Sequence, residues 1–395
     1  MNHIENIKFL VGNKNLLREA LKPFDETICS FLDELSKYLM NSASSFKHSD
    51  IKTFAFFCRK KNILNLKKKF SNLNNRKGVG LLFHITPANI PTNFAYSLIF
   101  GLLSGNKNII KVPSKNFPQI EIICDAINII LIKFNSLKNF VKIVRYSENE
   151  EFTKNISLIC DGRLIWGGND TINKIRKYPV KEISRDLAFA DRNSFCIFNT
   201  EKLIKLSSKK IEDLALKFYN DTFLVDQNAC SSPHVIFWLG KKNNKSKNYF
   251  WSSFYKLANS KYDLDHSAIF YKEDRLMSDL ILKNNNVKNF KKFGNLIYCI
   301  DLDNKKINPS ELISRWGYFY EVEIKKLNEL SKFSNIFTQT LTYFGFEKEE
   351  FNKIINKKNF NGIDRIVPVG QALDINLNWD GYDIINSLSK TIDVR

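Results

Sequence analysis

The loop from Asp226 to His234 contains the residue type best suited to covalent chemistry, a cysteine at position 230. Small and polar residues flank Cys230, a helix-like stretch precedes the loop, and the apolar run 235–239 follows it. This pattern predicts a turn on which the thiol faces a cleft and acts as a nucleophile. A lone cysteine is more often a small buried apolar residue than a catalyst, and the loop by itself does not exclude that alternative.

A thiol that attacks a carbonyl needs hydrogen-bond donors for the oxyanion that develops. The segment 86–91, which reads Thr-Pro-Ala-Asn-Ile-Pro, places the amide of Asn89 between prolines that stiffen the backbone. Such an amide is held in place at little entropic cost and can donate to an oxyanion. The alternative is an asparagine in a proline-rich turn with no chemical role.

In the first half of the chain, the pattern of apolar residues changes near residue 78. Residues 1–77 predict a helical segment with an apolar stripe at helical spacing. Residues 78–187 predict a nucleotide-binding domain of doubly wound, Rossmann type, because short apolar runs alternate with helical stretches. Its expected strands cover 79–85, 108–112 and 140–144, its expected strand and turn cover 164–170, and its expected helices cover 93–104 and 119–134.

The second half continues the α/β pattern and contains Cys230. Residues 188–345 predict a catalytic domain, and residues 346–395 predict an ordered segment that returns to the nucleotide-binding domain or to a subunit interface. In the catalytic domain we expect a helix at 208–221 and strands at 195–198, 235–239, 296–300, 318–324 and 336–343. With 395 residues, 44% of them hydrophobic, the chain is large enough for a sizeable core.

The composition restricts the compartment and the partners. Seven cysteines, an odd number, are scattered without zinc-ligand spacing, so we expect reduced thiols in the cytoplasm and no metal site. The N-terminus lacks a basic region followed by an apolar one, so no signal peptide is expected. The apolar run 90–103 is too short to span a bilayer, and no membrane span is expected.

The net charge of +19 raises the question of nucleic acid as a partner. The basic residues are spread along the chain, and the clusters at 67–69 and 241–247 lack the interleaved aromatic residues of a base-stacking surface. A solvated basic surface is therefore favoured over a specific nucleic-acid site.

Taken together, the motifs resemble those of the aldehyde dehydrogenase superfamily. This resemblance rests on four runs: Ile85-Thr-Pro-Ala-Asn-Ile-Pro91, Gly101-Leu-Leu-Ser-Gly-Asn106, Ile109-Ile-Lys-Val-Pro-Ser-Lys115 and Gln227-Asn-Ala-Cys230. More narrowly, Gln-Asn-Ala-Cys-Ser-Ser-Pro-His234, the segment 364–372 and Trp379-Asp-Gly-Tyr382 resemble the LuxC-type acyl-CoA (fatty-acid) reductases. The resemblance covers residues 78 to 395 and implies an aldehyde dehydrogenase-like fold.

The resemblance also implies roles for the two candidate catalytic residues. Cys230 corresponds to the acyl-accepting nucleophile, and Asn89 corresponds to the oxyanion donor, shared with the backbone N–H of Cys230. Thiolate attack on a thioester would then give an acyl-enzyme that accepts hydride from a reduced nicotinamide and releases an aldehyde.

The cofactor contacts follow from the same resemblance. Lys111 and Ser114 correspond to adenosine-ribose contacts, Gly167 and Gly168 to the glycine turn near the pyrophosphate, and Thr86 and Pro87 lie in the motif beside them. Lys115 stands where members that prefer NAD often carry glutamate. A cation there can pair with a 2′-phosphate, so NADPH is expected, with NADH as the alternative. Equally, Lys115 fits an ordinary surface lysine.

One departure from the superfamily pattern bears on the direction of the reaction. Ala188 replaces the glutamate that activates water in the oxidising members. Without that base an acyl-enzyme persists long enough to be reduced. The segment that holds the nicotinamide ribose has no confident counterpart, although 318–323 lies in roughly the right place. For His234 a packed role is favoured over tuning of the thiolate, and for His84 structural and acid-base roles stay open.

We therefore predict an acyl-CoA reductase that uses NADPH to reduce an acyl thioester to an aldehyde through an acyl-enzyme on Cys230. The alternatives are a CoA-acylating aldehyde dehydrogenase that works in the oxidative direction and a degenerate scaffold that binds nucleic acid or a surface. The expected partners are an acyl-CoA or acyl-carrier substrate, an acyl-protein synthetase and further copies of the chain in a homo-oligomer.

Overall fold

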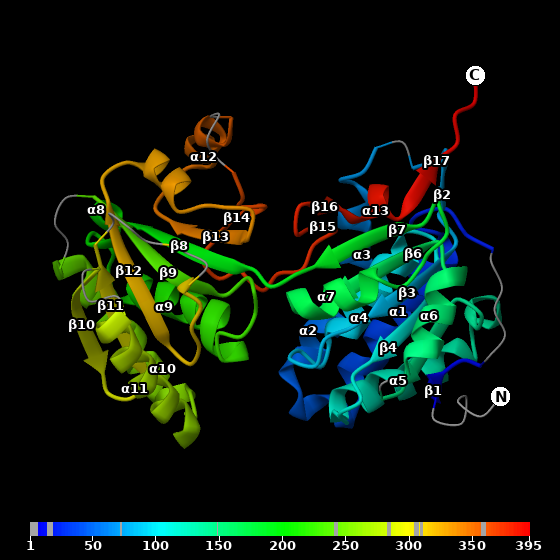
Figure 1. Ribbon diagram of the computed structural model, residues 1–395, viewed down its shortest axis with the longest axis horizontal. Helices are drawn as coiled ribbons and strands as arrows, with labels where there is room; N and C mark the ends of the chain where they lie inside the picture. Colours follow the sequence, from blue (N-terminus) through cyan, green and yellow to red (C-terminus); the bar gives the residue numbers. More distant parts are fainter. Residues whose placement is uncertain are drawn as a thin grey trace. The chain divides into compact units, whose positions relative to one another are not determined.

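The computed structural model describes residues 7–13, 19–71, 73–147, 149–240, 244–282, 286–303, 308, 311–356 and 361–395. The N-terminal residues 1–6, used for the signal-peptide expectation, and residues 241–243 of the predicted basic cluster lie outside the described residues. The chain divides into two compact units, Met1–Ala190 with Ile375–Arg395, and Asp191–Asp374 (Figure 1).

A six-stranded sheet organises the first unit. Five of its strands are parallel, and β1 pairs antiparallel with β5 at one edge. In spatial order the strands are β1 (Lys8–Val11), β5 (Val141–Arg145), β4 (Lys107–Val112), β3 (Leu81–Ile85), β6 (Gly162–Trp166) and β7 (Arg185–Phe189).

This strand order has a topological switch point between β3 and β6. From β3 the chain moves outward to β4 and β5, and it then crosses back to β6 and β7 on the other side of β3. The connections that leave β3 and β6 therefore run in opposite directions, an arrangement that in doubly wound sheets places a crevice at the carboxyl ends of such strands. Such crevices are the usual ligand sites of doubly wound sheets.

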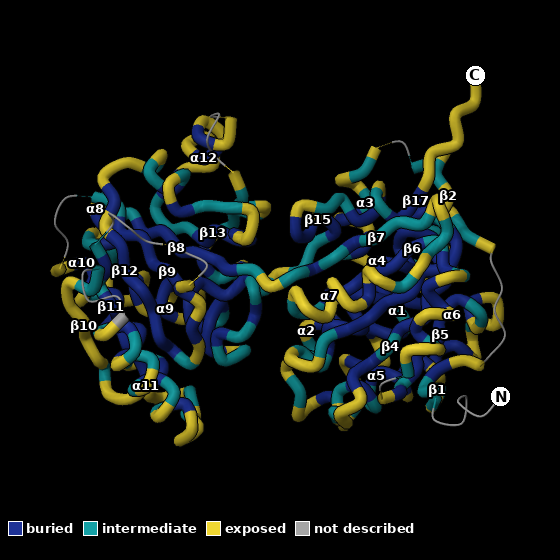
Figure 2. Tube along the Cα trace, viewed as in Figure 1, coloured by how far each residue is buried: buried dark blue, intermediate teal, exposed yellow. Residues whose placement is uncertain are grey.

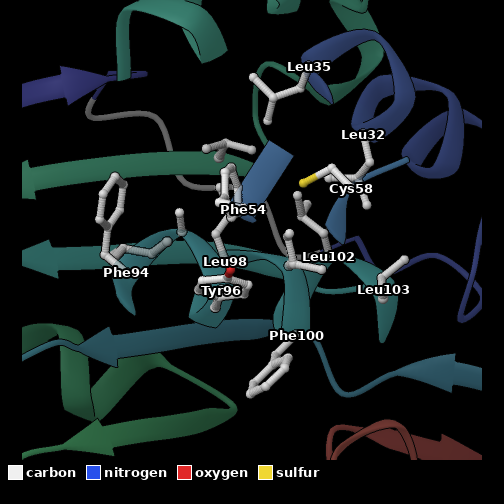
Figure 3. Close-up of a cluster of buried hydrophobic side chains, with 14 of the residues drawn as sticks. Leu32, Leu35, Phe54, Cys58, Phe94, Tyr96, Leu98, Phe100, Leu102 and Leu103 are labelled. Carbon is white, nitrogen blue, oxygen red and sulfur yellow. The ribbon is translucent and has the colours of Figure 1, made fainter. Parts of the chain in front are cut away.

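Helices surround this sheet, and one of them is buried on every side. All residues of α4 are buried, because α1 and α2 cover the side that does not face the sheet (Figure 3). The stripe Ile28, Phe31, Leu32, Leu35 and Leu39 lies on the buried side of α1, which confirms the predicted helix. The helices are α1 (Glu26–Asn41), α2 (Ser49–Phe57), α3 (Lys60–Lys67), α4 (Asn93–Leu103), α5 (Pro118–Leu131), α6 (Glu150–Ile159) and α7 (Asn169–Arg176).

The segment Ile375–Arg395 belongs to the first unit. Its elements are β15 (Asn378–Trp379), β16 (Tyr382–Asp383), α13 (Ile384–Ser387) and β17 (Ser389–Thr391). Strand β17 pairs antiparallel with β2 (Arg76–Gly78). The buried amide of Asn106 adds to this pairing, because it accepts from the Gly80 N–H at 2.9 Å and donates to the Leu388 carbonyl at 2.8 Å. Apolar side chains of the segment, including Trp379 and Leu388, join the core of the first unit.

A seven-stranded sheet organises the second unit. Its strands are parallel except β10, an exposed antiparallel edge strand (Figure 2). In spatial order they are β10 (Val287–Phe293), β11 (Ile297–Leu302), β12 (Tyr318–Ile324), β9 (Pro233–Leu239), β8 (Asn193–Asn199), β13 (Thr338–Phe344) and β14 (Arg365–Pro368). The helices of this unit are α8 (Thr200–Leu203), α9 (Ser208–Thr222), α10 (Asn244–Lys261), α11 (His266–Leu282) and α12 (Lys348–Ile355).

The two sheets agree with the predicted α/β class, and most expected strands lie within one or two residues of the observed ones. Among the elements that were not predicted are α6, α10, α11, α12, β1, β7, β10 and β14. None of the helices in the described ranges combines the length and the hydropathy that crossing a bilayer requires.

Gly101 in α4 gives a test of the first unit. A Cβ at this position would lie 1.7 Å from Asn108 Oδ1 and 3.2 Å from His84 Nε2. Gly101→Ala must displace the Asn108 amide, so we expect a loss of about 3 kcal/mol in the free energy of unfolding, despite the better helix propensity of alanine. Denaturant unfolding of the full chain measures this change.

The control is Asn155→Ala on the exposed side of α6, which should change the free energy of unfolding by no more than about 0.5 kcal/mol. If Gly101→Ala matches this control, the packing of α4 against Asn108 is not as described.

Candidate active site

The loop before β9 places Cys230 on a turn after two residues with left-handed backbone. Helix α9 ends at Thr222, and a short 3₁₀ turn, Phe223–Val225, leads to Asp226 with φ 52° and Gln227 with φ 60°. Each non-glycine residue in this region costs about 1–2 kcal/mol. The loop keeps this conformation only because surrounding contacts hold it.

The side chain of Gln227 supplies the main contacts. It is fully buried, and its Nε2 donates to the carbonyls of Pro233 at 3.0 Å and Tyr318 at 3.2 Å. Its Oε1 accepts from the Gly317 N–H at 3.0 Å. One amide therefore ties the start of the loop to the start of β9 and to the turn before β12.

Cys230 itself is half-buried and is anchored through its main chain. Its carbonyl accepts from Ser194 Oγ at 2.6 Å, and Ser194 Oγ accepts from the Thr340 N–H at 3.1 Å. The turn is thus connected to β8 and through it to β13. These bonds use the backbone of Cys230, so they fix its position without using the thiol.

The other six cysteines have a different setting. Burial raises the thiol pKa of each of them, to about 11 for Cys29, which is half-buried in α1. The remaining five are buried in the cores: Cys58, Cys124, Cys160, Cys196 and Cys299. Cys230 is the cysteine that combines partial exposure with a place on a turn between elements.

Four residues after Cys230, His234 is a buried residue of β9 rather than a solvent-facing base. Its Nδ1 accepts from the Ser314 N–H at 3.4 Å. Burial lowers the pKa of the imidazole to about 4, so His234 is neutral near pH 7. This environment fits the packed role that the sequence favoured.

The segment 364–372, one of the motifs of the sequence, closes against the helix that leads to Cys230. Asp221 at the end of α9 accepts from the N–H groups of Gly370 at 2.7 Å and Ala372 at 2.8 Å. Burial raises the pKa of Asp221 to about 7. The guanidinium of Arg365 donates to the Ala372 and Asp374 carbonyls at 3.1 and 2.9 Å. These contacts give the motif a structural role in holding α9.

In the first unit, the predicted cofactor residues lie at the carboxyl ends of β3 and β4. Thr86 follows β3 and donates from Oγ1 to the Lys111 carbonyl at 2.8 Å, which joins the two strand ends. Pro87 is half-buried, and Asn89 is exposed on the bend between β3 and α4. Their neighbour Lys111 is half-buried at the end of β4, with its Nζ 5.1 Å from the centre of the Tyr146 ring.

The remaining predicted residues extend this group along the same edge of the sheet. Ser114 and Lys115 are exposed after β4, and Lys115 Nζ lies 5.2 Å from the centre of the Phe117 ring. Gly167 and Gly168 are half-buried between β6 and α7, where Gly168 is the N-cap of the helix. The structure thus brings all of these residues to the carboxyl ends of three neighbouring strands, whereas Cys230 belongs to the second unit.

These residues fit a dinucleotide. The crevice at the switch point is the usual place for such a ligand, and two glycines let the backbone approach a pyrophosphate. The N-terminus of α7 presents unpaired N–H groups there, although Asp170 in its first turn opposes an anion. Lys111, Ser114 and Lys115 supply two cations and a hydroxyl along the next strand end.

His84, left open by the sequence, is part of a buried chain of hydrogen bonds in the first unit. Its Nδ1 lies 2.7 Å from Ser97 Oγ and its Nε2 lies 3.0 Å from Asn108 Oδ1. The Trp166 indole donates to Ser97 Oγ at 3.0 Å. Burial lowers the pKa of His84 to about 3, which fits a structural role rather than acid-base chemistry.

Two further residues, Ala188 and Glu321, lie within strands. Ala188 lies in β7, paired with Ile165 of β6, and is half-buried. Glu321, in the segment considered for the ribose contact, is buried in β12 and accepts from the indoles of Trp238 at 2.6 Å and Trp251 at 2.9 Å. The Glu321 carboxylate therefore makes its hydrogen bonds within the core of the second unit. No residue is assigned to the nicotinamide-ribose contact.

The fold is that of the aldehyde dehydrogenases, as predicted. A lactaldehyde dehydrogenase from Escherichia coli matches with a TM-score of 0.62 and 11% identity, over 92% of this chain and 85% of that one. A variant 1-pyrroline-5-carboxylate dehydrogenase from Thermus thermophilus gives 0.59 and 11%, over 92% and 80%. An indole-3-acetaldehyde dehydrogenase complexed with NAD⁺ gives 0.60 and 11%, over 92% and 82%.

The sequence itself places the chain more narrowly. The profile of the acyl-CoA reductase (LuxC) family matches residues 58–391. The chain therefore belongs to the LuxC family of acyl-CoA reductases, which confirms the resemblance seen in the motifs and makes it an enzyme of that family. None of the curated proteins matches the chain.

The buried imidazole of His84 predicts a pH dependence of stability. Its folded pKa of about 3 lies below the ordinary value of 6.5, so its contribution is fully present above pH 6.5 and is lost as the pH falls toward 3. Between pH 7 and pH 5, the stability advantage of the wild type over His84→Gln should shrink by about 2 kcal/mol. Unfolding curves of both proteins at each pH measure it.

His266→Gln, on the exposed start of α11, is the matched control. A stability difference between wild type and His84→Gln that stays constant from pH 7 to pH 5 would contradict the burial of a neutral His84.

Proposed function

We propose that the enzyme reduces an acyl thioester to an aldehyde with NADPH and that Cys230 carries the acyl group between the two half-reactions. The observation that carries the proposal is the construction of the Cys230 turn. Two left-handed residues are held by the buried Gln227 amide, and the thiol sits on a half-exposed turn, while the other cysteines are buried or lie within helix α1. Strain maintained by buried hydrogen bonds is typical of functional loops.

The first half-reaction is acyl transfer. The Cys230 thiolate forms a bond to the thioester carbonyl carbon, the negative charge moves to the oxygen, and collapse breaks the bond to the carrier thiol, which leaves as a thiolate. We propose that the Asn89 amide and the Cys230 N–H donate to that oxygen. A donor of this kind contributes about 3 kcal/mol in comparable sites. The exposed position of Asn89 on its bend leaves the amide available for this role.

The second half-reaction needs an acyl-enzyme that survives in water. Ala188 has no group that could activate a water molecule, in the position where the oxidising relatives are expected to carry glutamate. A thioester on Cys230 therefore lasts long enough to be reduced. Hydride addition to its carbonyl gives a thiohemiacetal, whose collapse releases the aldehyde and regenerates the thiol. This supports reduction over the oxidative alternative.

The cofactor proposal rests on the crevice of the first unit. When bound there, a reduced nicotinamide dinucleotide supplies the hydride. As the family resemblance implies, its adenosine and pyrophosphate would lie among Thr86, Pro87, Lys111, Ser114, Gly167 and Gly168. The exposed ammonium of Lys115 supports NADPH, because it can pair with a 2′-phosphate. NADH is the alternative, and the NAD⁺ complex of the indole-3-acetaldehyde dehydrogenase concerns that protein.

The proposed partners and compartment follow from the same chemistry. The substrate is an acyl-CoA or an acyl carrier, and an acyl-protein synthetase is a further proposed donor. All seven cysteines are outside disulfides, which supports a reducing cytoplasm. A homo-oligomer is proposed from the family resemblance.

The acyl-enzyme is testable directly. Octanoyl-CoA without reductant should add one acyl group to Cys230, detectable by mass spectrometry, and NADPH should then release octanal. Cys230→Ser should lose both the adduct and the aldehyde, because its hydroxyl is a far weaker nucleophile. Asn89→Ala should keep the adduct site but slow acylation by about 100-fold.

Running the reaction from octanal, NADP⁺ and CoA compares the two directions. Aldehyde formation by Cys230→Ser at near-native rate would refute the acyl-enzyme. A much faster oxidative rate would instead favour the CoA-acylating alternative.

The role of Lys115 is testable through cofactor preference. Lys115→Glu should raise the KM for NADPH about tenfold or more and leave the KM for NADH nearly unchanged, because a carboxylate would repel only the 2′-phosphate. Steady-state kinetics with each cofactor measure the ratio. Lys138→Glu, an exposed lysine beyond α5, changes the net charge equally and is the control. Equal effects of the two substitutions would assign Lys115 to the general surface.

A further inference from the structure

A second turn, Ser314–Tyr318, packs against the loop that carries Cys230. The Trp316 N–H donates to the Asp226 carbonyl at 3.1 Å. The Gly317 N–H donates to Gln227 Oε1 at 3.0 Å, and the Tyr318 carbonyl accepts from Gln227 Nε2 at 3.2 Å. The 314–318 turn is therefore the surface against which the start of the Cys230 loop is held.

This turn is itself strained. Trp316 has φ 55° and Gly317 has φ 83°, so two consecutive residues adopt the left-handed region. A Cβ on Gly317 would lie 2.3 Å from the Leu296 carbonyl oxygen and 2.7 Å from Phe223 Cζ, which restricts this position to glycine. A peptide group between two such residues needs a partner on each side to keep its orientation.

Lys272 provides the partner on the far side of that peptide. It is fully buried in α11, and its Nζ donates to the carbonyls of Trp316 at 3.0 Å and Leu296 at 3.1 Å and also to the Asn295 carbonyl. The Trp316 carbonyl and the Gly317 N–H belong to one peptide group. Lys272 holds its oxygen while Gln227 accepts from its N–H.

We propose that Lys272 is a positioning residue for the nucleophile, acting through the Trp316–Gly317 peptide and Gln227 on the loop that carries Cys230. The inference rests on the proposed function, because it assigns Lys272 a part in placing that thiol. If the peptide rotated, the Gly317 N–H would turn away from Gln227 Oε1. A buried amide oxygen would then lose its donor, and the left-handed residues Asp226 and Gln227 would lose the contact that holds them.

This buried ammonium is retained at a cost. Burial lowers the pKa of Lys272 to about 7, so the folded protein disfavours the charge. The acceptors are main-chain carbonyls, and the ring of Tyr298 lies 5.0 Å from Nζ. An apolar side chain of similar length would avoid that penalty, so the three directed donors are the property that lysine adds at this place.

Lys247 offers a matched control in the same unit. It is also buried, on α10, but its ammonium faces the carboxylates of Glu323 at 3.0 Å and Asp301 at 3.8 Å. Replacing either lysine by methionine removes a buried cation of similar accessibility. Of these two lysines, Lys272 is the one that is bonded to the 314–318 turn.

The experiment uses the full chain with the substitutions Lys272→Met, Gln227→Leu, the pair together, and Lys247→Met. Single-turnover acylation of Cys230 by octanoyl-CoA should slow about tenfold or more in each of the first two, with half-saturation nearly unchanged, because the thiol is misplaced rather than the substrate lost. The double variant should be no slower than the slower single one, because both residues act through one peptide. Lys247→Met should acylate at close to the native rate.

A second readout does not depend on the acyl chemistry. The rate at which iodoacetamide alkylates Cys230, followed by mass spectrometry, should change in the same direction in Lys272→Met and in Gln227→Leu. The double variant should change this rate no further than the single variants do. If wild type forms no acyl adduct, the proposed function fails while this readout still decides the role of Lys272. Additive effects, or a folded Lys272→Met with native rates, would overturn the inference. If Lys272→Met does not fold, Lys272→Gln takes its place. Because glutamine keeps two donors, it should change the acylation and alkylation rates in the same direction but by less.

Discussion

One buried amide, the side chain of Gln227, joins three segments of the second unit. Gln227 uses its oxygen once and its nitrogen twice, and so connects the end of α9, the start of β9 and the turn before β12. Both left-handed residues before Cys230 persist because of these bonds. A buried amide left without a partner costs about 1–3 kcal/mol, which means that a small displacement of any of the three segments is opposed by all three bonds. The position of the thiol is therefore determined by bonds to the segments around the sheet and not by the loop alone.

The motifs shared with the family separate into two physical kinds. Some motif residues have a structural role: Gly101 allows α4 to approach Asn108, Asn106 joins β3 to the C-terminal segment, and the 364–372 segment binds Asp221 through its N–H groups. Others, such as Asn89 and Lys115, are exposed at the carboxyl ends of strands and make few contacts that would explain them structurally. The second kind is where ligand chemistry is expected, since the fold does not require those side chains.

The parallel strands and the Cys230 turn were predictable because their signals are local: apolar runs, glycines and a cysteine between polar residues. Helix α10 carries Phe250, Trp251, Phe254 and Ala258 at helical spacing, so that signal was present and was missed. Helix α11 differs, because its buried positions 268, 272, 276 and 279 include a lysine and an aspartate, and hydrophobic periodicity cannot find polar residues that are buried. For the same reason no pattern in the sequence pointed to Lys272. Its partners are main-chain carbonyls, which have no sequence signature.

The return of residues 375–395 to the first unit has a consequence for how the protein is made. The second unit is one continuous stretch of chain, whereas the first contains two stretches separated by the whole of the second. During synthesis residues 191–374 can complete their sheet before β17 exists to pair with β2. The first unit is therefore the last to close. Until then the edge at Arg76–Gly78 and the apolar sites for Trp379 and Leu388 are open to chaperones or to misassociation.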